Sequence, residues 1–243
     1  MLLKIYPDYP MLSRAAADLI VRFISKKKNS LICLASGHTP LGVFQCLVED
    51  AKNKKVDFSQ CTFVSLDEWL GIDPKQAGSC REMMDRGFFQ PLQWPEKHIR
   101  FFDGSTATPE KDCEAMNEFI ASHGGLDIML VGVGTNGHIA MNEPGTSFDA
   151  YAHVSILAEE TKNVGQKYFT SSTELSKGLT LGLRHLRESR LPIIMASGGK
   201  KAAIMKQAMT HAPAESLPVS IHHLIDHGYF MMDSAAQPLN LKP

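Results

Sequence analysis

The sequence predicts an α/β fold of the Rossmann-like, three-layer type, with a mostly parallel sheet flanked by helices on both faces. Short apolar segments that suit buried strands alternate with longer segments whose apolar residues recur every three or four positions. Several strand-like segments end in turns with glycine, serine or acidic residues, where open parallel sheets bind ligands. The length of 243 residues and the 44% hydrophobic content fit a single domain spanning residues 1–243.

Charge and cysteine usage exclude several classes of function. The chain has 25 basic and 26 acidic residues, and we expect its basic run from Lys26 to Lys28 to be a solvated helix end, so no nucleic-acid partner is expected. The 5 cysteines never occur as C-x-x-C, which argues against a disulfide framework or a zinc site and indicates a cytoplasmic location. The amino-terminal MLLKIYPDYP lacks the apolar region of a signal peptide, and no segment approaches the roughly 20 apolar residues of a membrane span.

Strand and helix signals alternate in the first half of the chain. Residues 2–6 predict a short strand, and residues 10–27 predict a helix because their apolar residues keep the three-and-four spacing. Residues 30–35 predict a second strand, which turns directly into a second helix, and residues 62–66 predict a third strand. The S-x-x-E pattern from Ser79 to Glu82 is a capping box, which indicates a further helix start.

The second half of the chain continues this alternation. Strands are expected at residues 98–102, 128–131, 153–157, 178–183, 192–196 and 229–232, and helices at residues 108–123, 162–169 and after residue 200. The pair Gly124 and Gly125 suits the end of the helix at 108–123. This order of elements favours a mostly parallel sheet.

The turn formed by Ser36, Gly37, His38 and Thr39 is a candidate anion site. It joins a buried strand to a helix, and we expect Thr39 to cap that helix with Pro40 at its first position. Free backbone N–H groups at such a helix start bind anions, and phosphate is the anion we expect. The alternatives are an ordinary capped helix start and, for His38, an ordinary surface position.

Two other predicted strand ends carry candidate residues. Asp67 and Glu68 follow the third strand, and because adjacent side chains point to opposite sides, only one acid should face the cleft. We choose Asp67, although a turn or cap residue is the alternative. The turn from Ser197 to Lys201 places glycines and a lysine at a helix start, which suits a second phosphate contact; an exposed lysine is the alternative.

The loop within DIMLVGVGTNGHIAMNEP is the most informative stretch of the chain. Three glycines lead from a buried strand to Asn136, His138 and Glu143. A histidine with a carboxylate within hydrogen-bonding reach suits general acid–base catalysis, because histidine titrates near neutral pH.

Cofactor and metal sites are two alternative interpretations of this loop. Its glycines match G-x-G-x-x-G, but the dinucleotide fingerprint needs a helix at the third glycine, and the segment from Asn142 to Gly145 breaks any helix. A metal site could use His138, Glu143 and Asp67, yet no second histidine lies at ligand spacing. We therefore expect neither a metal nor an organic cofactor.

Four separated motifs occur in the order ICLASGHTPLG, FVSLDEW, VGVGTNGHIAMNEPG and SGGKKA. Together they resemble the family of glucosamine-6-phosphate deaminases and galactosamine-6-phosphate isomerases, over nearly the whole chain. Related sugar-phosphate lactonases share the S-G-x-T-P turn but lack the N-E-P ending. The resemblance implies a small-molecule partner, an aminosugar 6-phosphate, which the enzyme opens, isomerises and deaminates without a cofactor.

The resemblance also implies roles for individual residues. Asp67 matches the base that moves a proton between C2 and C1, while His138 and Glu143 match the pair that opens the sugar ring. The residues that match phosphate-binding positions are Ser36, Gly37, His38, Thr39 and Lys201, and Lys167 falls where an arginine would assist. Family members range from monomers to hexamers, so a homo-oligomer is among the expected states.

Asn136 departs from the pattern of glucosamine-6-phosphate deaminases, which carry an aspartate there. The imidazolium form of His138 should therefore be less favoured, and ring opening should depend more on Glu143. Asn136, LDEW and the segment 78–80 look closer to the galactosamine-6-phosphate isomerase branch. We therefore expect galactosamine 6-phosphate as the substrate, ahead of glucosamine 6-phosphate, which differs at C4.

Regulation is a second departure from the family pattern. His153 and Ser155 align with basic residues of an allosteric site known in some bacterial members, and the chain ends early, at Pro243. We expect no activation by N-acetylaminosugar phosphates.

Two alternatives to a deaminase stay open: a lactonase acting on a phosphorylated sugar acid and a non-catalytic sugar-phosphate sensor. Release of ammonia separates a deaminase from a lactonase. The presence of Asp67, His138 and Glu143 together argues against a sensor, because binding alone needs only the phosphate contacts.

Overall fold

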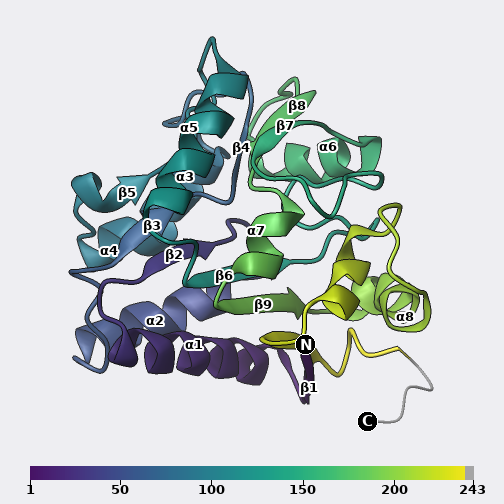
Figure 1. Cartoon of the computed structure of the whole chain (residues 1–243), viewed down its shortest axis with the longest axis horizontal. Coiled ribbons are helices and arrows are strands. Elements are labelled where there is room, and N and C mark those ends of the chain that lie inside the picture. Colours follow the sequence, from purple (N-terminus) through teal and green to yellow (C-terminus); the bar gives the residue numbers. More distant parts are fainter. Residues whose placement is uncertain (239–243) are drawn as a thin grey trace.

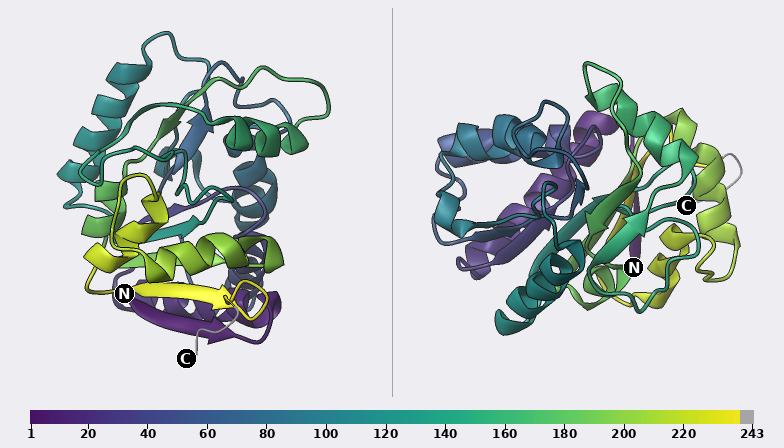
Figure 2. Two further views of the ribbon diagram at one scale, coloured as in Figure 1. Left: turned by 90° about the vertical axis from the view of Figure 1, so that its right-hand side faces the viewer. Right: turned by 90° about the horizontal axis from the view of Figure 1, so that it is seen from above.

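A parallel sheet of seven strands forms the centre of the computed structural model, which describes residues 1–238 (Figure 1). The strands lie in the order β1-β10-β9-β6-β2-β3-β5, and every neighbouring pair is parallel. Their bounds are β1 (Leu2–Tyr6), β2 (Leu31–Leu34), β3 (Thr62–Val64), β5 (Ile99–Arg100), β6 (Ile128–Gly132), β9 (Leu191–Ala196) and β10 (Tyr229–Asp233). The strands nearest the two ends of the chain, β1 and β10, lie side by side at one edge of the sheet (Figure 2).

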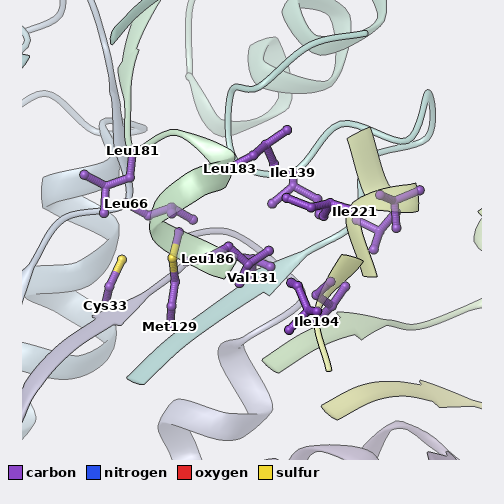
Figure 3. Close-up of a cluster of buried hydrophobic side chains, with 14 of the residues drawn as sticks. Cys33, Leu66, Met129, Val131, Ile139, Leu181, Leu183, Leu186, Ile194 and Ile221 are labelled. Atoms are coloured by element: carbon purple, nitrogen blue, oxygen red, sulfur yellow. The ribbon is translucent and has the colours of Figure 1, made fainter. Parts of the chain in front are cut away.

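Helices cover both faces of the sheet because successive strand residues point to opposite sides. Ile32 and Leu34 of β2 belong to the core shared with α1 and α2, whereas Cys33 belongs to the core shared with α5, α7 and α8 (Figure 1). Figure 3 shows the second core, where Val131 of β6 lies near Leu186 of α7. The helices are α1 (Tyr9–Lys26), α2 (Leu41–Lys52), α3 (Cys80–Met84), α4 (Gln90–Leu92), α5 (Pro109–Ser122), α6 (Glu159–Gly165), α7 (Leu183–Glu188) and α8 (Ala202–Thr210). The predicted fold class is confirmed.

A second, three-stranded antiparallel sheet was not predicted from the sequence. It consists of β4 (Asp67–Trp69), β8 (Lys177–Thr180) and β7 (His153–Ile156), and it packs against α5. The strand predicted at residues 62–66 therefore ends at Val64. The Leu66 carbonyl accepts the Leu181 N–H at 2.8 Å, which joins the chain to the second sheet before Asp67.

Three other predicted bounds were wrong. The strand predicted at 178–183 ends at Thr180, and α7 begins at Leu183. Between them, position 182 suits glycine because a Cβ there would lie 2.0 Å from the Ala150 carbonyl oxygen. The helix predicted at 162–169 begins at Glu159, with two acids in its first turn, and continues as a 3-10 turn, η3 (Gln166–Tyr168). The strand predicted at 98–102 pairs only over its two residues in β5.

The helix start predicted at Ser79 is confirmed. The Ser79 hydroxyl accepts the Glu82 N–H at 3.0 Å, which is one of the two hydrogen bonds of a capping box; the Glu82 carboxylate accepts the Gly78 N–H at 3.4 Å in place of the Ser79 N–H. No helix between Met1 and residue 238 has the length and hydropathy needed to cross a membrane. The chain end at Pro243, which entered the prediction about activation, lies outside the described residues.

Candidate active site

A cavity of about 340 Å³ lies at the carboxyl ends of β2, β6 and β9. It is lined by the turns that follow these three strands and by Asp67 at the start of β4. Helix α6 and the turn η3 add Thr161, Val164, Gly165 and Tyr168 to its wall. This is the position at which open α/β sheets bind ligands, as the sequence predicted.

The turn from Ser36 to Thr39 lines this cavity, but Thr39 does not cap the following helix as predicted. Helix α2 has no side-chain hydrogen bond at its cap residue. Instead, the Tyr9 hydroxyl accepts the Gly42 N–H at 2.8 Å and donates to the Thr39 carbonyl at 2.9 Å. Tyr9 therefore fixes the turn, while the backbone N–H groups of Gly37 and Thr39 make no hydrogen bond within residues 1–238. Such N–H groups suit an anion.

Tyr168 reaches this turn, whereas the predicted Lys167 does not. The Tyr168 hydroxyl lies 3.2 Å from Nδ1 of His38, and the two rings stack with their centroids 5.2 Å apart. A Cβ on Gly37, whose φ is 89°, would lie 2.9 Å from the same hydroxyl, so the phenol lies over the turn. Burial raises the pKa of the Tyr168 phenol, which keeps it neutral. Lys167 is exposed and does not line the cavity.

Lys201 lines the cavity from the turn that follows β9. Burial lowers the pKa of its ammonium group, and the residue forms no ion pair with the described part of the chain. Asp233 at the end of β10 fixes this turn, because its carboxylate accepts the Gly198 N–H at 3.0 Å and the Ser197 hydroxyl. A cation without an ionic partner, in the same cavity as backbone N–H groups that suit an anion, is suited to phosphate.

Of the two acids at the start of β4, only one lines the cavity, as predicted. Asp67 lines the cavity and accepts a hydrogen bond from the Cys80 thiol at 3.5 Å, and burial raises the pKa of its carboxyl to about 6. Glu68 does not line the cavity; its carboxylate accepts the backbone N–H groups of Trp69, Cys80 and Arg81, each at 2.9 Å. Glu68 therefore fixes the segment that carries Cys80, and Asp67 is the acid available to a ligand.

The glycine loop after β6 closes on itself and opens no helix. The Gly134 N–H donates to the His138 carbonyl at 2.8 Å, and the Gly137 N–H donates to the Gly134 carbonyl at 3.1 Å. A Cβ on Gly134 would lie 2.3 Å from the His138 ring, and Gly137 has a φ of 87°. Both glycines therefore serve the turn that presents His138. Between β6 and β7, where every residue is described, no helix occurs, as expected from the missing dinucleotide context.

His138 lines the cavity, whereas Glu143, its predicted partner, does not. Nδ1 of His138 lies 3.7 Å from Oε2 of Glu143, which is too far for the predicted hydrogen bond. Asn136 holds both groups, since its Nδ2 donates to that Oε2 at 2.9 Å and its Oδ1 accepts the His138 N–H at 3.1 Å. Burial lowers the pKa of the His138 ring, Glu143 opposes this shift and Lys201 adds to it, so the neutral ring is favoured.

Thr161 provides the hydrogen-bond contact that Glu143 does not make. Its hydroxyl lies 3.0 Å from Nδ1 of His138. Sequence reasoning missed Thr161, Tyr168, Cys80 and Tyr9. Thr161, Tyr168 and Cys80 line the cavity, and Tyr9 contacts the turn that lines it. No local sequence pattern reveals where their elements lie in space, although Tyr168 is adjacent to the predicted Lys167.

The alternative metal site is not formed by the described residues. Within residues 1–238, no group of three or more histidine, cysteine, aspartate or glutamate side chains is arranged to hold a metal ion.

Comparisons with known proteins agree with these motifs. The family model for glucosamine-6-phosphate isomerases and 6-phosphogluconolactonase matches residues 9–228. A glucosamine-6-phosphate deaminase of Geobacillus sp. is 34% identical over 217 residues, covering 89% of this chain and 86% of the relative. A putative deaminase of Escherichia coli, AgaI, is 34% identical over 213 residues, covering 88% of this chain and 84% of the relative.

Solved structures give the same picture of the fold. A monomeric glucosamine-6-phosphate deaminase superposes with a TM-score of 0.93 at 30% identity, covering 97% of this chain and 98% of that chain. A 6-phosphogluconolactonase from Trypanosoma brucei superposes with a TM-score of 0.76 at 19% identity, covering 97% of both chains. The second likeness shows a shared fold only.

Proposed function

We propose that this chain, which belongs to the family of glucosamine-6-phosphate isomerases and 6-phosphogluconolactonases, is an enzyme that isomerises and deaminates an aminosugar 6-phosphate. The products are a ketose 6-phosphate and ammonia. The observation that carries the proposal is the convergence of Asp67, His138 and an anion-binding turn on one cavity. A phosphate sensor would need the turn alone.

The phosphate end of the substrate is assigned to the turn from Ser36 to Thr39 and to Lys201. The uncommitted N–H groups of the turn and the ammonium group of Lys201 line the same cavity. Binding energy gained at the phosphate positions the distant carbon atoms for reaction, which raises the rate at which they react.

His138 opens the sugar ring in this proposal. Its neutral ring accepts the proton of the C1 hydroxyl while the bond between C1 and the ring oxygen breaks, and the imidazolium then gives that proton to the ring oxygen. The pKa of His138 is lowered by burial, so the ring is unprotonated and able to act as a base near neutral pH. Glu143, close behind it, stabilises the imidazolium that forms.

Asp67 moves the proton from C2 to C1. Its carboxylate takes the C2 proton while the ammonium group of the substrate gives a proton to the C1 oxygen, which leaves an enol bearing a neutral amine. The carboxyl group then returns its proton to C1, which leaves an iminium at C2. Water then adds to C2 and ammonia leaves. Burial raises the pKa of Asp67 to about 6, which increases its strength as a base while it stays mostly ionised at pH 7.

Galactosamine 6-phosphate is the substrate we propose first, with glucosamine 6-phosphate second. Asn136 supports the first, because it replaces the aspartate expected in glucosamine-6-phosphate deaminases. The relatives named glucosamine-6-phosphate deaminase support the second. The two sugars differ at C4, so the test is a comparison of rates.

The experiment measures ammonia release from both aminosugar phosphates at matched enzyme concentration and without added metal. Hydrolysis of 6-phosphogluconolactone is measured in parallel, and binding of each aminosugar phosphate is measured by calorimetry. The variant Asp67→Asn is the control, because it removes the proposed base and keeps the phosphate contacts.

Each result separates the candidate functions. A higher kcat/KM for the galacto sugar supports the proposed substrate, and a higher value for the gluco sugar replaces it. Lactone hydrolysis without ammonia release refutes the deaminase and identifies a lactonase. Binding without turnover of any of the three compounds identifies a sensor.

A further inference from the structure

The hydrogen bond to Nδ1 of His138 comes from an element far away in the sequence. Thr161 Oγ1 lies 3.0 Å from this nitrogen, and Oε2 of Glu143 lies 3.7 Å from it. Hydrogen bonds between nitrogen and oxygen have donor–acceptor distances of about 2.7–3.2 Å. The threonine hydroxyl is therefore the hydrogen-bond partner of Nδ1, and the carboxylate is a nearby charge.

Asn136 holds Glu143 away from Nδ1 of His138, so the carboxylate does not take the hydrogen bond that Thr161 makes. The Asn136 amide donates to Oε2 of Glu143 at 2.9 Å and accepts the His138 N–H at 3.1 Å, so one side chain fixes the carboxylate relative to the histidine backbone. The carboxylate therefore acts on the ring through its charge and leaves Nδ1 to the hydroxyl.

Thr161 is well placed to orient the ring. The residue is only 5% exposed, it lies near the start of α6, and its hydroxyl has no other partner in the described part of the chain. The oxygen of this hydroxyl can accept a hydrogen bond from a proton on Nδ1, and a proton held there leaves Nε2 unprotonated in the neutral ring. Nε2 of His138 makes no hydrogen bond to residues 1–238, which leaves it available to a substrate.

We infer that Thr161 is a positioning residue that holds His138 as its Nδ1–H tautomer, with Nε2 directed to the sugar as the base for ring opening. The charges that act on the ring agree with this tautomer. Glu143 lies on the Nδ1 side and favours a proton there, while Lys201 disfavours positive charge on the ring. This inference rests on the proposed function, because only ring opening gives His138 a proton to move.

The test combines NMR with kinetics on the full chain. The ¹⁵N shifts of histidine ring nitrogens report tautomer and titration, and the variant His138→Gln identifies the signals of His138 among the 10 histidines. Thr161→Val removes the hydroxyl with little change in volume, and Thr161→Ser keeps the hydroxyl. Ammonia release is followed as a function of pH for the wild type, Thr161→Val and Thr161→Ser.

In the wild type we expect the Nδ1–H tautomer. In Thr161→Val, the Nε2–H tautomer should appear, and the pKa of His138 should fall by about one unit, since the charged ring loses a stronger hydrogen bond than the neutral ring. We expect kcat at pH 7 to fall about tenfold and KM to change less than about twofold, because orientation of a bound group is lost. Thr161→Ser should keep the tautomer and recover most of kcat.

Several results would overturn the inference. An Nε2–H tautomer of His138 in the wild type contradicts the inference. This result needs no variant, so the inference stays testable even if Thr161→Val does not fold. An unchanged tautomer and titration in a folded Thr161→Val protein also contradict it. A wild-type protein that releases no ammonia refutes the proposed function instead, and the NMR result then decides the contact between Thr161 and His138 independently.

Discussion

We propose that the ionised carboxylate of Asp67 is needed for catalysis but lowers the free energy of unfolding. The variant Asp67→Asn should separate these two effects. The substitution keeps the shape of the side chain and removes its charge. Burial raises the pKa of Asp67 from 3.8 to about 6, and each pKa unit corresponds to about 1.4 kcal/mol. The ionised carboxylate therefore lowers the free energy of unfolding by about 3 kcal/mol, and the asparagine variant should regain this amount above the folded pKa.

The pH dependence of this gain follows from the direction of the shift. Between the unfolded pKa of 3.8 and the folded value of about 6, the folded protein binds more protons than the unfolded chain, so the wild type loses stability as the pH rises through this window. The variant lacks this loss. The gain in unfolding free energy of the variant over the wild type should be small below pH 4 and complete above about pH 6. The loss of the Asp67 charge should also lower the raised pKa of Glu68, which adds to the gain.

Denaturant unfolding across this pH range measures the stability difference, and ammonia release measures the loss of the base. We expect turnover to fall by about 10³-fold, within the range known for general bases, while binding of the sugar phosphate persists. Asp73→Asn is the matched control: Asp73 is exposed, lies in the same segment and accepts the Lys75 N–H, so neither stability nor turnover should change. A variant that retains turnover, or whose stability difference is the same at low and neutral pH, would refute this reasoning.

Three more predictions test the remaining parts of the site. Tyr168→Phe should raise KM for the sugar phosphate about tenfold with kcat nearly unchanged, whereas Lys167→Met should leave KM unchanged, because only the phenol lies over the turn; a larger effect from Lys167→Met would restore the assignment made from the sequence. Asn136→Asp should raise the pKa of His138 by adding a negative charge, and thus move the acidic limb of the kcat/KM profile to higher pH; an unchanged profile would contradict this. N-acetylaminosugar phosphates should not shift the half-saturation of the wild type, since the family resemblance implies that His153 stands where members with an allosteric site carry another basic residue; a clear shift in a saturation assay would contradict this.

The principal chemical groups were predictable because they lie at strand ends marked by local sequence. Strand alternation predicted that only one of Asp67 and Glu68 faces the cleft, and Asp67 was the acid chosen; the cavity and the three backbone N–H contacts of Glu68 agree with that choice. His138 could be assigned from the glycine loop, whose internal hydrogen bonds are local. Patterns of this kind persist in the structure because their physical cause acts within a few residues.

The second sheet could not be predicted, because its pairing joins residues far apart in the chain. Asp67 pairs with Thr180, and nothing near Asp67 indicates that partner. The predicted strand at 62–66 had the right apolar character, but its end was set by the contact between Leu66 and Leu181.

The sequence by itself determined the parallel sheet, the placement of site residues at its carboxyl edge and the family to which the chain belongs. Only the tertiary structure decided which side chains complete the site. Thr161 replaces Glu143 at Nδ1 of His138, Tyr168 replaces Lys167 at the turn from Ser36 to Thr39, and Tyr9 replaces Thr39 at the start of α2. The physical reason is range: a strand end or a tight turn depends on neighbouring residues, whereas a hydrogen bond across the cavity depends on how separate elements pack.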